Sequence, residues 1–300
     1  MEACRTNVAL RNVLFATDFS EESAHAVPYL QSLRQAYGTE IHAVHVVDVF
    51  PYPLSDAAAL AERAVHVREQ AEVRLRDFML AQGFERKQFQ AAVLTGEIFE
   101  AVDSFVGAHH IDLIVLGSRG DLGIGRMFLG STAEEIFRSA KCPVITIGPR
   151  ASAPRPSGVF DRLLFATDLS RHSAAAVPYL EWLLEQNPSS TVTMLHVLPH
   201  QEHALEQQLA LSRIEEQVLS LIAPELRGQV AGVIVKPSEP ALAMVRAAAQ
   251  IEADLLVLGV RYGGSFLRAS THSLWSLTAE VIGKASCPVL TVRSSGPTEA

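Results

Sequence analysis

A segment with the composition of an anion-binding loop lies near the middle of the chain, between Gly117 and Phe137. It reads GSRGDLGIGRMFLGSTAEEIF and holds five glycines within fourteen residues. Glycine in such numbers weakens helices and strands, which indicates a place where bare backbone is needed. From Gly130 the pattern becomes helical, and the first N–H groups of a helix attract anions. The spacing predicts a phosphate site, to which Ser131 or Thr132 adds a hydroxyl donor.

A second interpretation of this segment stays open. The glycines also fit a flexible surface loop that ends in an ordinary Ser/Thr helix cap. The segment is not a P-loop, because no G-x-x-x-x-G-K-[ST] occurs in the chain. It is also not a compact G-x-G-x-x-G turn after the first strand, because FATD stands there instead.

The elements that must position this loop occur twice. Residues 13–30 match residues 163–180 at thirteen of eighteen positions without a gap. The later matches keep their order: 43–48 with 194–199, 112–120 with 254–262, and 141–147 with 286–292. A repeat of this period indicates a duplicated domain. We expect one unit at 1–148 and another at 161–296, joined by a proline-rich linker at 149–160.

Each copy alternates short apolar runs with longer helical patterns. The runs LIVLG and LLVLG are continuously apolar, which is typical of parallel strands that helices cover on both faces. The pattern predicts an α/β fold of two tandem, doubly wound, open parallel sheets of five strands each. Ser20 and Ser170 are expected helix N-caps. In the first copy we expect strands at 12–16, 40–47, 89–94, 112–117 and 144–148, and helices at 20–36, 55–82, 98–109 and 131–140.

Composition excludes several classes of protein. The chain has 300 residues, a net charge of −8 and a pI near 5.8, which argues against nucleic acid as a partner. No apolar run approaches a membrane span and the start lacks a signal-peptide core, so we expect a cytoplasmic protein without membrane contact. The three cysteines are too scattered for a disulfide framework or a zinc cluster. Cys142 and Cys287 are expected to be small buried side chains.

The glycine spacing resembles a known nucleotide signature. Gly117, Gly120, Gly130 and Ser131 fill the pattern G-x2-G-x9-G-[ST], which is similar to the ATP-binding signature of the universal stress protein family. The FATDFS, HVVD and KCPV segments fit the same family, and the resemblance covers essentially the whole chain as two copies. It implies strand order 3-2-1-4-5 in each copy, the arrangement of adenine nucleotide alpha hydrolase-like folds.

The resemblance also implies a site in the first copy for ATP, with or without Mg2+. Asp18 would hold the ribose hydroxyls, as an acceptor for both. Its alternative role is to cap the first helix, and the two roles can hold together. The backbone after His45 would read the adenine edge, and the glycine loop would wrap the phosphates. The residues that the resemblance assigns to the nucleotide are Ala16, Asp18, Val46, Gly117, Gly120, Gly130, Ser131 and Thr132.

The second copy departs from this signature. It keeps Asp168 and Gly259, but Tyr262 stands where the first copy has Gly120, and Trp275 stands where it has Gly130. Three extra residues lie between them. We expect a degenerate second site and one nucleotide per chain. Altered nucleotide binding remains an alternative, as does a Trp275 that packs in the core.

Other residue clusters give weaker signals. His200 and His203 lie one turn apart beside Glu202, but no third metal ligand is in view, so no metal site is expected. His109 and His110 are expected to end a helix, where cationic side chains suit the helix dipole. No G-x-S-x-G motif or other catalytic set occurs, so we expect no catalytic residues and at most slow ATP hydrolysis.

The sequence therefore favours an ATP-binding universal stress protein that acts in stress response or signalling through a protein partner. The alternative is a nucleotide-independent interaction scaffold. An ATP-using enzyme of a related fold is disfavoured, because the SGG-type pyrophosphatase loop and the HxGH motif are absent. The last strands, 144–148 and 289–293, are expected at sheet edges and to meet each other, because an exposed apolar edge invites association. The chain would then be an internal pseudo-dimer, and a homodimer of whole chains stays open.

Overall fold

We describe the protein from a computed structural model. It describes residues 8–47, 57–118, 136, 140–155, 160–198, 207–260 and 271–294. Within these ranges only the backbone is described for 57–61, 207–210, 236 and 271–276.

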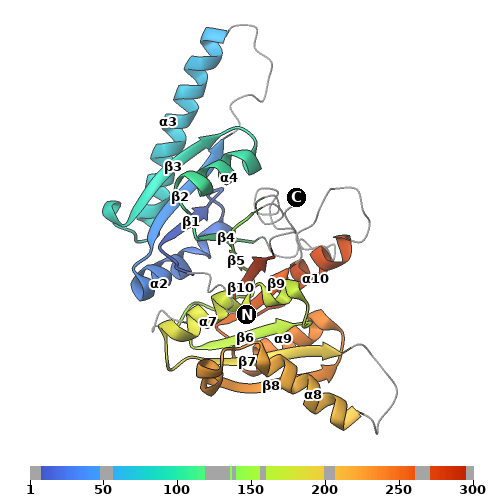
Figure 1. Cartoon of the computed structure of the whole chain (residues 1–300). Coiled ribbons are helices and arrows are strands. Elements are labelled where there is room, and N and C mark those ends of the chain that lie inside the picture. The colour runs from blue at the N-terminus through green and yellow to red at the C-terminus, as the bar shows by residue number, and fades with distance from the viewer. Residues whose placement is uncertain are drawn as a thin grey trace.

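Ten strands form one sheet in the order β3-β2-β1-β4-β5-β10-β9-β6-β7-β8 (Figure 1). The strands of the first half are β1 Asn12–Ala16, β2 Glu40–Val47, β3 Phe89–Thr95, β4 Leu113–Gly117 and β5 Val144–Ile147. Those of the second half are β6 Arg162–Thr167, β7 Thr191–Leu198, β8 Val230–Pro237, β9 Leu255–Val260 and β10 Val289–Arg293. Within each half the order is 3-2-1-4-5 and every pairing is parallel, as predicted.

The two sheets expected from the sequence are one continuous sheet. β5 and β10 pair antiparallel, with Ile145 opposite Leu290, so the predicted meeting of the last two strands is confirmed. Each strand is short and apolar, and pairing them covers two edges that would otherwise face solvent. The pairing makes the chain an internal pseudo-dimer.

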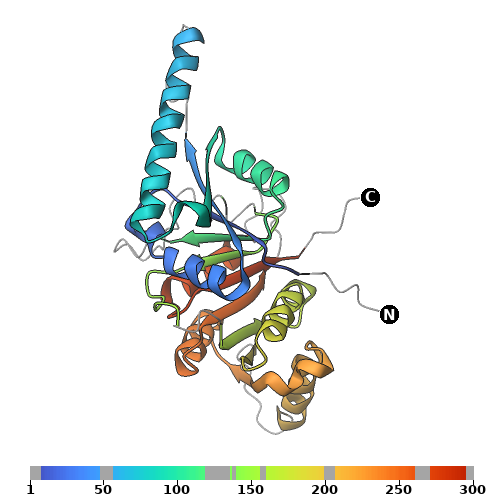
Figure 2. The same cartoon turned by 90° about the vertical axis from the view of Figure 1, so that its left-hand side faces the viewer.

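Helices cover both faces of the sheet (Figures 1 and 2). Along β1, Val13 and Phe15 belong to one core cluster while Leu14 belongs to the other, which is the alternation of a strand buried on both faces. The long helix α3 extends past the end of the sheet. The helices are α1 Glu21–Ala24, α2 Val27–Tyr37, α3 Ala57–Ala81, α4 Ile98–Ala108, α6 Arg171–Ala174, α7 Val177–Gln186, α8 Gln207–Ser220, α9 Pro240–Gln250 and α10 Thr271–Lys284; the 3-10 turns are η1 Arg86–Gln88 and η2 Pro224–Gln229.

The single helix expected at 20–36 is two helices, α1 and α2, so this prediction was wrong. Pro28 lies in the first turn of α2. A proline has no N–H to donate, and its ring clashes with the carbonyl four residues earlier, so a helix cannot run through it undisturbed. The predicted N-cap at Ser20 is confirmed, since its hydroxyl oxygen accepts from the N–H of Ser23 at 3.2 Å. The helix expected at 131–140 lies outside the described residues except for positions 136 and 140.

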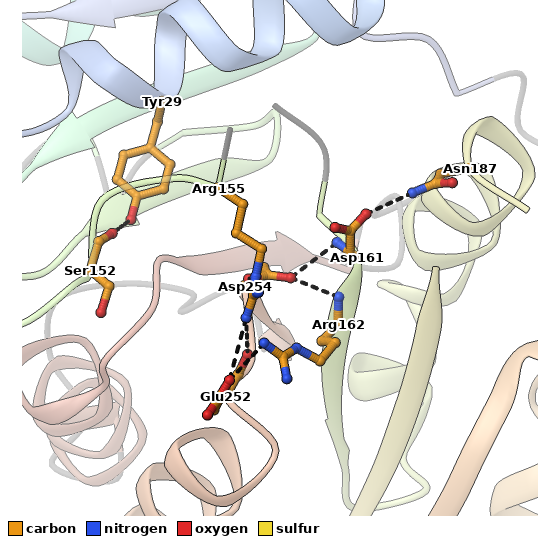
Figure 3. Close-up of polar contacts among 8 residues, drawn as sticks. All are labelled: Tyr29, Ser152, Arg155, Asp161, Arg162, Asn187, Glu252 and Asp254. Atoms are coloured by element: carbon orange, nitrogen blue, oxygen red, sulfur yellow. Dashed lines mark hydrogen bonds and ion pairs between the residues drawn. The ribbon is translucent and has the colours of Figure 1, made fainter. Parts of the chain in front are cut away.

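The segment between the halves lies against both of them (Figure 3). The Ser152 N–H donates to the Ser286 carbonyl at 2.9 Å, and the Tyr29 hydroxyl donates to the Ser152 carbonyl. Further on, Arg155 forms ion pairs with Asp254 and Glu252. The described part of the linker is therefore bound to the first half through α2 and to the second half at the starts of β9 and β10.

Close packing at the junction depends on Gly148, which follows β5. A Cβ at this position would lie 2.0 Å from the carbonyl oxygen of Ile282 in α10. The second half of the chain thus approaches the end of β5 as closely as bare backbone allows. No larger residue fits without a shift of α10 or β5.

We expect Gly148→Ala to lower the free energy of unfolding by about 1–3 kcal/mol, because α10 must move away from β5. Urea denaturation followed by circular dichroism measures this change. Gly107→Ala in α4 is the matched control, because a Cβ there meets nothing within 4 Å. It should be neutral or stabilise the protein by up to about 1 kcal/mol, as alanine does inside a helix. A Gly148→Ala protein as stable as the parent would contradict this account of the junction.

Candidate functional site

The candidate site lies where the strand order of the first half reverses. β1 and β4 are parallel neighbours, with Phe15 opposite Val115, so the chain leaves both strands at the same edge of the sheet. From β1 it continues to β2 on one side, while β4 leads to β5 on the other. In open parallel sheets, ligands bind in the crevice beyond this point. The arrangement brings Ala16, Asp18 and Gly117 to one edge, and Val46 to the adjacent strand end.

The turn after β1 is held by its own hydrogen bonds. Phe19 has a φ of 66°, a backbone conformation that non-glycine residues rarely adopt. Its N–H donates to the Thr17 hydroxyl oxygen at 2.9 Å, and that hydroxyl also pairs with the Ser23 hydroxyl at 2.8 Å. The Thr17 N–H continues the ladder to the Val44 carbonyl at 3.0 Å. The position of Asp18 between them is therefore well determined.

His45 of β2 supports the same turn from the side. Its Nδ1 lies 2.8 Å from the Thr17 carbonyl oxygen, which can only accept, so Nδ1 carries a hydrogen and donates. Burial lowers the pKa of His45 and the charge of Arg74 acts in the same direction, while the Thr17 bond and Asp18 oppose them. A neutral His45 with its proton on Nδ1 is the form that this geometry requires.

Asp18 itself contacts the start of α1. Its Oδ1 accepts from the Ser20 N–H at 3.0 Å and from the Ser20 hydroxyl at 2.5 Å. Ser20 is the N-cap of α1, so Asp18 orients the capping residue and does not cap the helix itself. The side chain is nevertheless exposed at the strand edge. Support of the N-cap serine and ligand binding are therefore compatible at this position.

Gly117 has a packing role that the sequence did not reveal. A Cβ at Gly117 would lie 2.0 Å from the Glu22 carbonyl oxygen and 2.8 Å from the Ser23 Cα. The bare backbone expected for a ligand is thus already required by α1, which crosses the end of β4. The equivalent Gly259 has the same packing role, because a Cβ added there would lie 2.2 Å from the His172 carbonyl oxygen. Glycine at this position does not by itself indicate a ligand.

Several predicted site residues lie outside the described part of the chain. These are Gly120, Gly130, Ser131 and Thr132, which together form the expected phosphate loop. The described residue next to it, Ser118, was missed by the sequence reasoning. It is buried, and both its N–H and its hydroxyl donate to the Ile147 carbonyl, at 3.0 and 3.2 Å. Ser118 thereby fixes the end of β4 to the end of β5.

An aromatic and cationic cluster beside the turn also had no sequence signal. The Arg74 guanidinium carbon lies 4.4 Å from the centre of the Phe19 ring, a cation–π arrangement. The Phe19 ring also lies 4.3 Å from the His45 ring and 5.8 Å from the Phe78 ring. Arg74 and Phe78 come from α3, whose helical pattern predicts a core face but not which strand end it covers.

The second half repeats the turn. His196 Nδ1 lies 2.8 Å from the Thr167 carbonyl, and Leu169 has a φ of 62°. Burial acts to raise the pKa of Asp168, but hydrogen bonds from Ser170 and Ser173 outweigh it, and the net shift is downward.

Basic residues replace acidic ones at the start of the second half's first helix. Arg171 and His172 stand where the first half has Glu21 and Glu22, and His172 Nδ1 lies 2.6 Å from the Ser294 hydroxyl. Trp275 lies in α10, where only the backbone is described, and Tyr262 is outside the described residues.

The described residues offer little support for other kinds of site. They contain no group of three or more His, Cys, Asp or Glu side chains that could hold a metal ion. The His200–Glu202–His203 group is outside them. None of their helices is both long and apolar enough to cross a membrane. Cys287 is buried, as predicted, whereas Cys142 is only half-buried. Burial raises the pKa of each thiol to about 12.

The comparisons with known proteins all identify the same family. The sequence model of the universal stress protein family matches the chain twice, at residues 9–148 and 160–293. Universal stress protein Slr1230 of Synechocystis is 24% identical over 306 residues, covering 95% of this chain and 100% of that one. A universal stress protein of Thermus aquaticus is 30% identical over 138 residues, covering 46% of this chain and 98% of its own. A solved universal stress protein of Archaeoglobus fulgidus shares the fold, with a TM-score of 0.66 and 22% identity over 95% of this chain and 98% of that one.

The packing role of the strand-end glycines can be tested separately from any ligand. We expect Gly117→Ala and Gly259→Ala to lower the melting temperature of the ligand-free protein by similar amounts, because each Cβ meets helix backbone. Differential scanning calorimetry measures both. A neutral Gly259→Ala would show that α6 can move aside, and the glycine would then need another explanation.

Proposed function

The chain belongs to the universal stress protein family, and we propose that its first repeat binds ATP at the strand edge formed by β1 and β4. The observation that carries the proposal is the glycine signature after β4, which only the first half has, next to the turn Thr17–Phe19 that holds Asp18 at the reversal of strand order. A carboxylate placed there can accept hydrogen bonds from both hydroxyls of a ribose. The glycine loop that follows Gly117 supplies the family's phosphate signature.

We assign the individual roles by the family resemblance. The backbone of Ala16 and Gly117 would flank the ribose and that of Val46 would contact the adenine. Gly120, Gly130, Ser131 and Thr132 would surround the phosphates, and a Mg2+ ion would neutralise part of their charge. In this assignment no residue at the edge is catalytic, so hydrolysis would be slow or absent. Binding rather than turnover would be the function, in stress response or signalling in the cytoplasm.

A nucleotide-independent scaffold is the second candidate. The second half keeps the hydrogen-bonded turn after its first strand, the supporting His196 and the strand-end Gly259, although its phosphate signature is lost. If the second half binds no nucleotide, its strand edge is maintained for structural reasons alone. If the same holds for the first half, the protein would act through its surfaces, with a protein partner and no nucleotide.

The first test separates ribose binding from helix capping. In Asp18→Asn the amide oxygen can still accept from Ser20, so the start of α1 is preserved, but the charge is lost. We expect the dissociation constant for ATP to rise about 10- to 100-fold, the range for losing a hydrogen bond to a charged group. Isothermal titration calorimetry should give one site per chain. Asp168→Asn, the matched change in the second repeat, should leave ATP binding unchanged; equal effects of both changes would contradict a single site.

The second test copies the second repeat into the first. We expect Gly130→Trp to abolish ATP binding while the ligand-free melting temperature stays close to that of the parent, because the bulk should enter the phosphate space. Ser131→Ala should be milder, at roughly 1–3 kcal/mol of binding free energy for one lost contact to a charged group. If Gly130→Trp binds ATP as the parent does, the loop does not need bare backbone and the scaffold function is favoured.

A further inference from the structure

An unpaired buried histidine lies at the opposite edge of the first half. His42 of β2 is only 4% exposed, and its neighbours on the flanking strands are Leu14 and Gln90. Within the described part of the chain, neither of its ring nitrogens has a hydrogen-bond partner. A buried polar group without a partner lowers stability and needs an explanation.

The His42 ring faces the end of α4. Its centre lies 5.3 Å from that of the His109 ring and 5.9 Å from that of the Phe105 ring. Phe105 and His109 stack on each other at 4.0 Å. His109 is the C-cap of α4 and is exposed. The buried imidazole is therefore covered by an exposed one.

The charges around His42 oppose its protonation on balance. Burial lowers the pKa of His42, and His109 lowers it further, while Glu40 on the same strand acts in the opposite direction. The flanking strands contribute the uncharged Leu14 and Gln90. On α4, Asp103 pairs instead with Lys141 at 2.8 Å.

The second half lacks this arrangement. Thr193 takes the place of His42, since it lies opposite Leu164 as His42 lies opposite Leu14. Ile251 is the C-cap of α9, as His109 is of α4. The same layers pack there without a histidine at either position. The histidine pair is therefore not a requirement of the fold.

We propose that His42 and His109 form an acid-sensing site, in which proton uptake by His42 releases α4 from β2. A protonated imidazole without a hydrogen-bond partner is strongly unfavourable in this buried environment. Separation of α4 from β2 would expose the ring to water, which can hydrate the charge. The neutral form is favoured in the closed state, so the closed state is fully stable above the ordinary histidine pKa near 6.5 and weakens as the pH falls below it. Opening would expose the apolar side of α4 that carries Val102 and Phe105. The site is independent of nucleotide binding, which is proposed at the other edge.

Hydrogen exchange of residues 98–111, measured by mass spectrometry and corrected for the intrinsic effect of pH, tests the proposal. Between pH 7.5 and 5.5 we expect the opening equilibrium of α4 to rise about 10-fold, as follows when only the open state binds the proton. His42→Thr, which copies the second half, should abolish this rise. His66→Gln, at an exposed position of α3, should retain it. The equivalent helix α9 should show no such rise.

A second measurement covers the case in which His42→Thr lowers overall stability. Titration of the His42 ring proton by nuclear magnetic resonance should give an apparent pKa below 6.5, and His109→Gln should raise it, because a like charge is removed. The proposal is overturned if α4 protects its amides equally at both pH values. It is also overturned if the acid response persists in His42→Thr, or if His42 titrates as an exposed histidine does.

Discussion

The antiparallel pairing of β5 with β10 is the contact on which the arrangement of this protein depends. All strands within a half are parallel, so reversing the direction at this one pairing turns the second half end for end relative to the first. The carboxyl ends of the strands in the first half therefore lie along the same edge of the sheet as the amino ends of the strands in the second half. The two carboxyl edges, where ligands could bind, consequently lie at opposite edges of the sheet and cannot share a ligand.

This reversal also explains why a short linker suffices. The chain leaves β5 at the edge where β6 must begin, and only β10 and β9 lie between them, a distance of about 14 Å at the usual strand spacing. The described part of the linker contacts the residues before these strands in order. Ser152 binds Ser286 just before β10, Arg155 binds Asp254 just before β9, and Asp254 then accepts from the Arg162 N–H at the start of β6. The described part of the segment that resembles a polar spacer in the sequence is thus bound to the rest of the structure.

The sequence predicted those features that depend on local pattern and on repetition. Continuous apolar runs located the strands, the repeat showed two equivalent halves, and the apolar last strands predicted their pairing. It did not predict features that depend on a distant backbone. The glycine pattern suggested a ligand at Gly117, but it could not show that α1 crosses the end of β4 there. His42 lies in an apolar strand and His109 at a helix end, and no spacing in the sequence indicates that the two rings meet.

The two halves together separate what the fold needs from what a ligand needs. Each feature that both halves share at the strand edge has a structural role: the histidine holds the turn, the aspartate accepts from the N-cap serine, and the glycine admits the helix. Their presence in a half is therefore no measure of nucleotide binding. Chemistry specific to one half must come from positions that differ, such as Phe19 against Leu169, Glu22 against His172 and Gly130 against Trp275. The case for ATP consequently depends on the glycine loop more than on the strand edge beside it. His42 is also specific to the first half, because the second half has threonine there, so the fold that the two halves share does not require it.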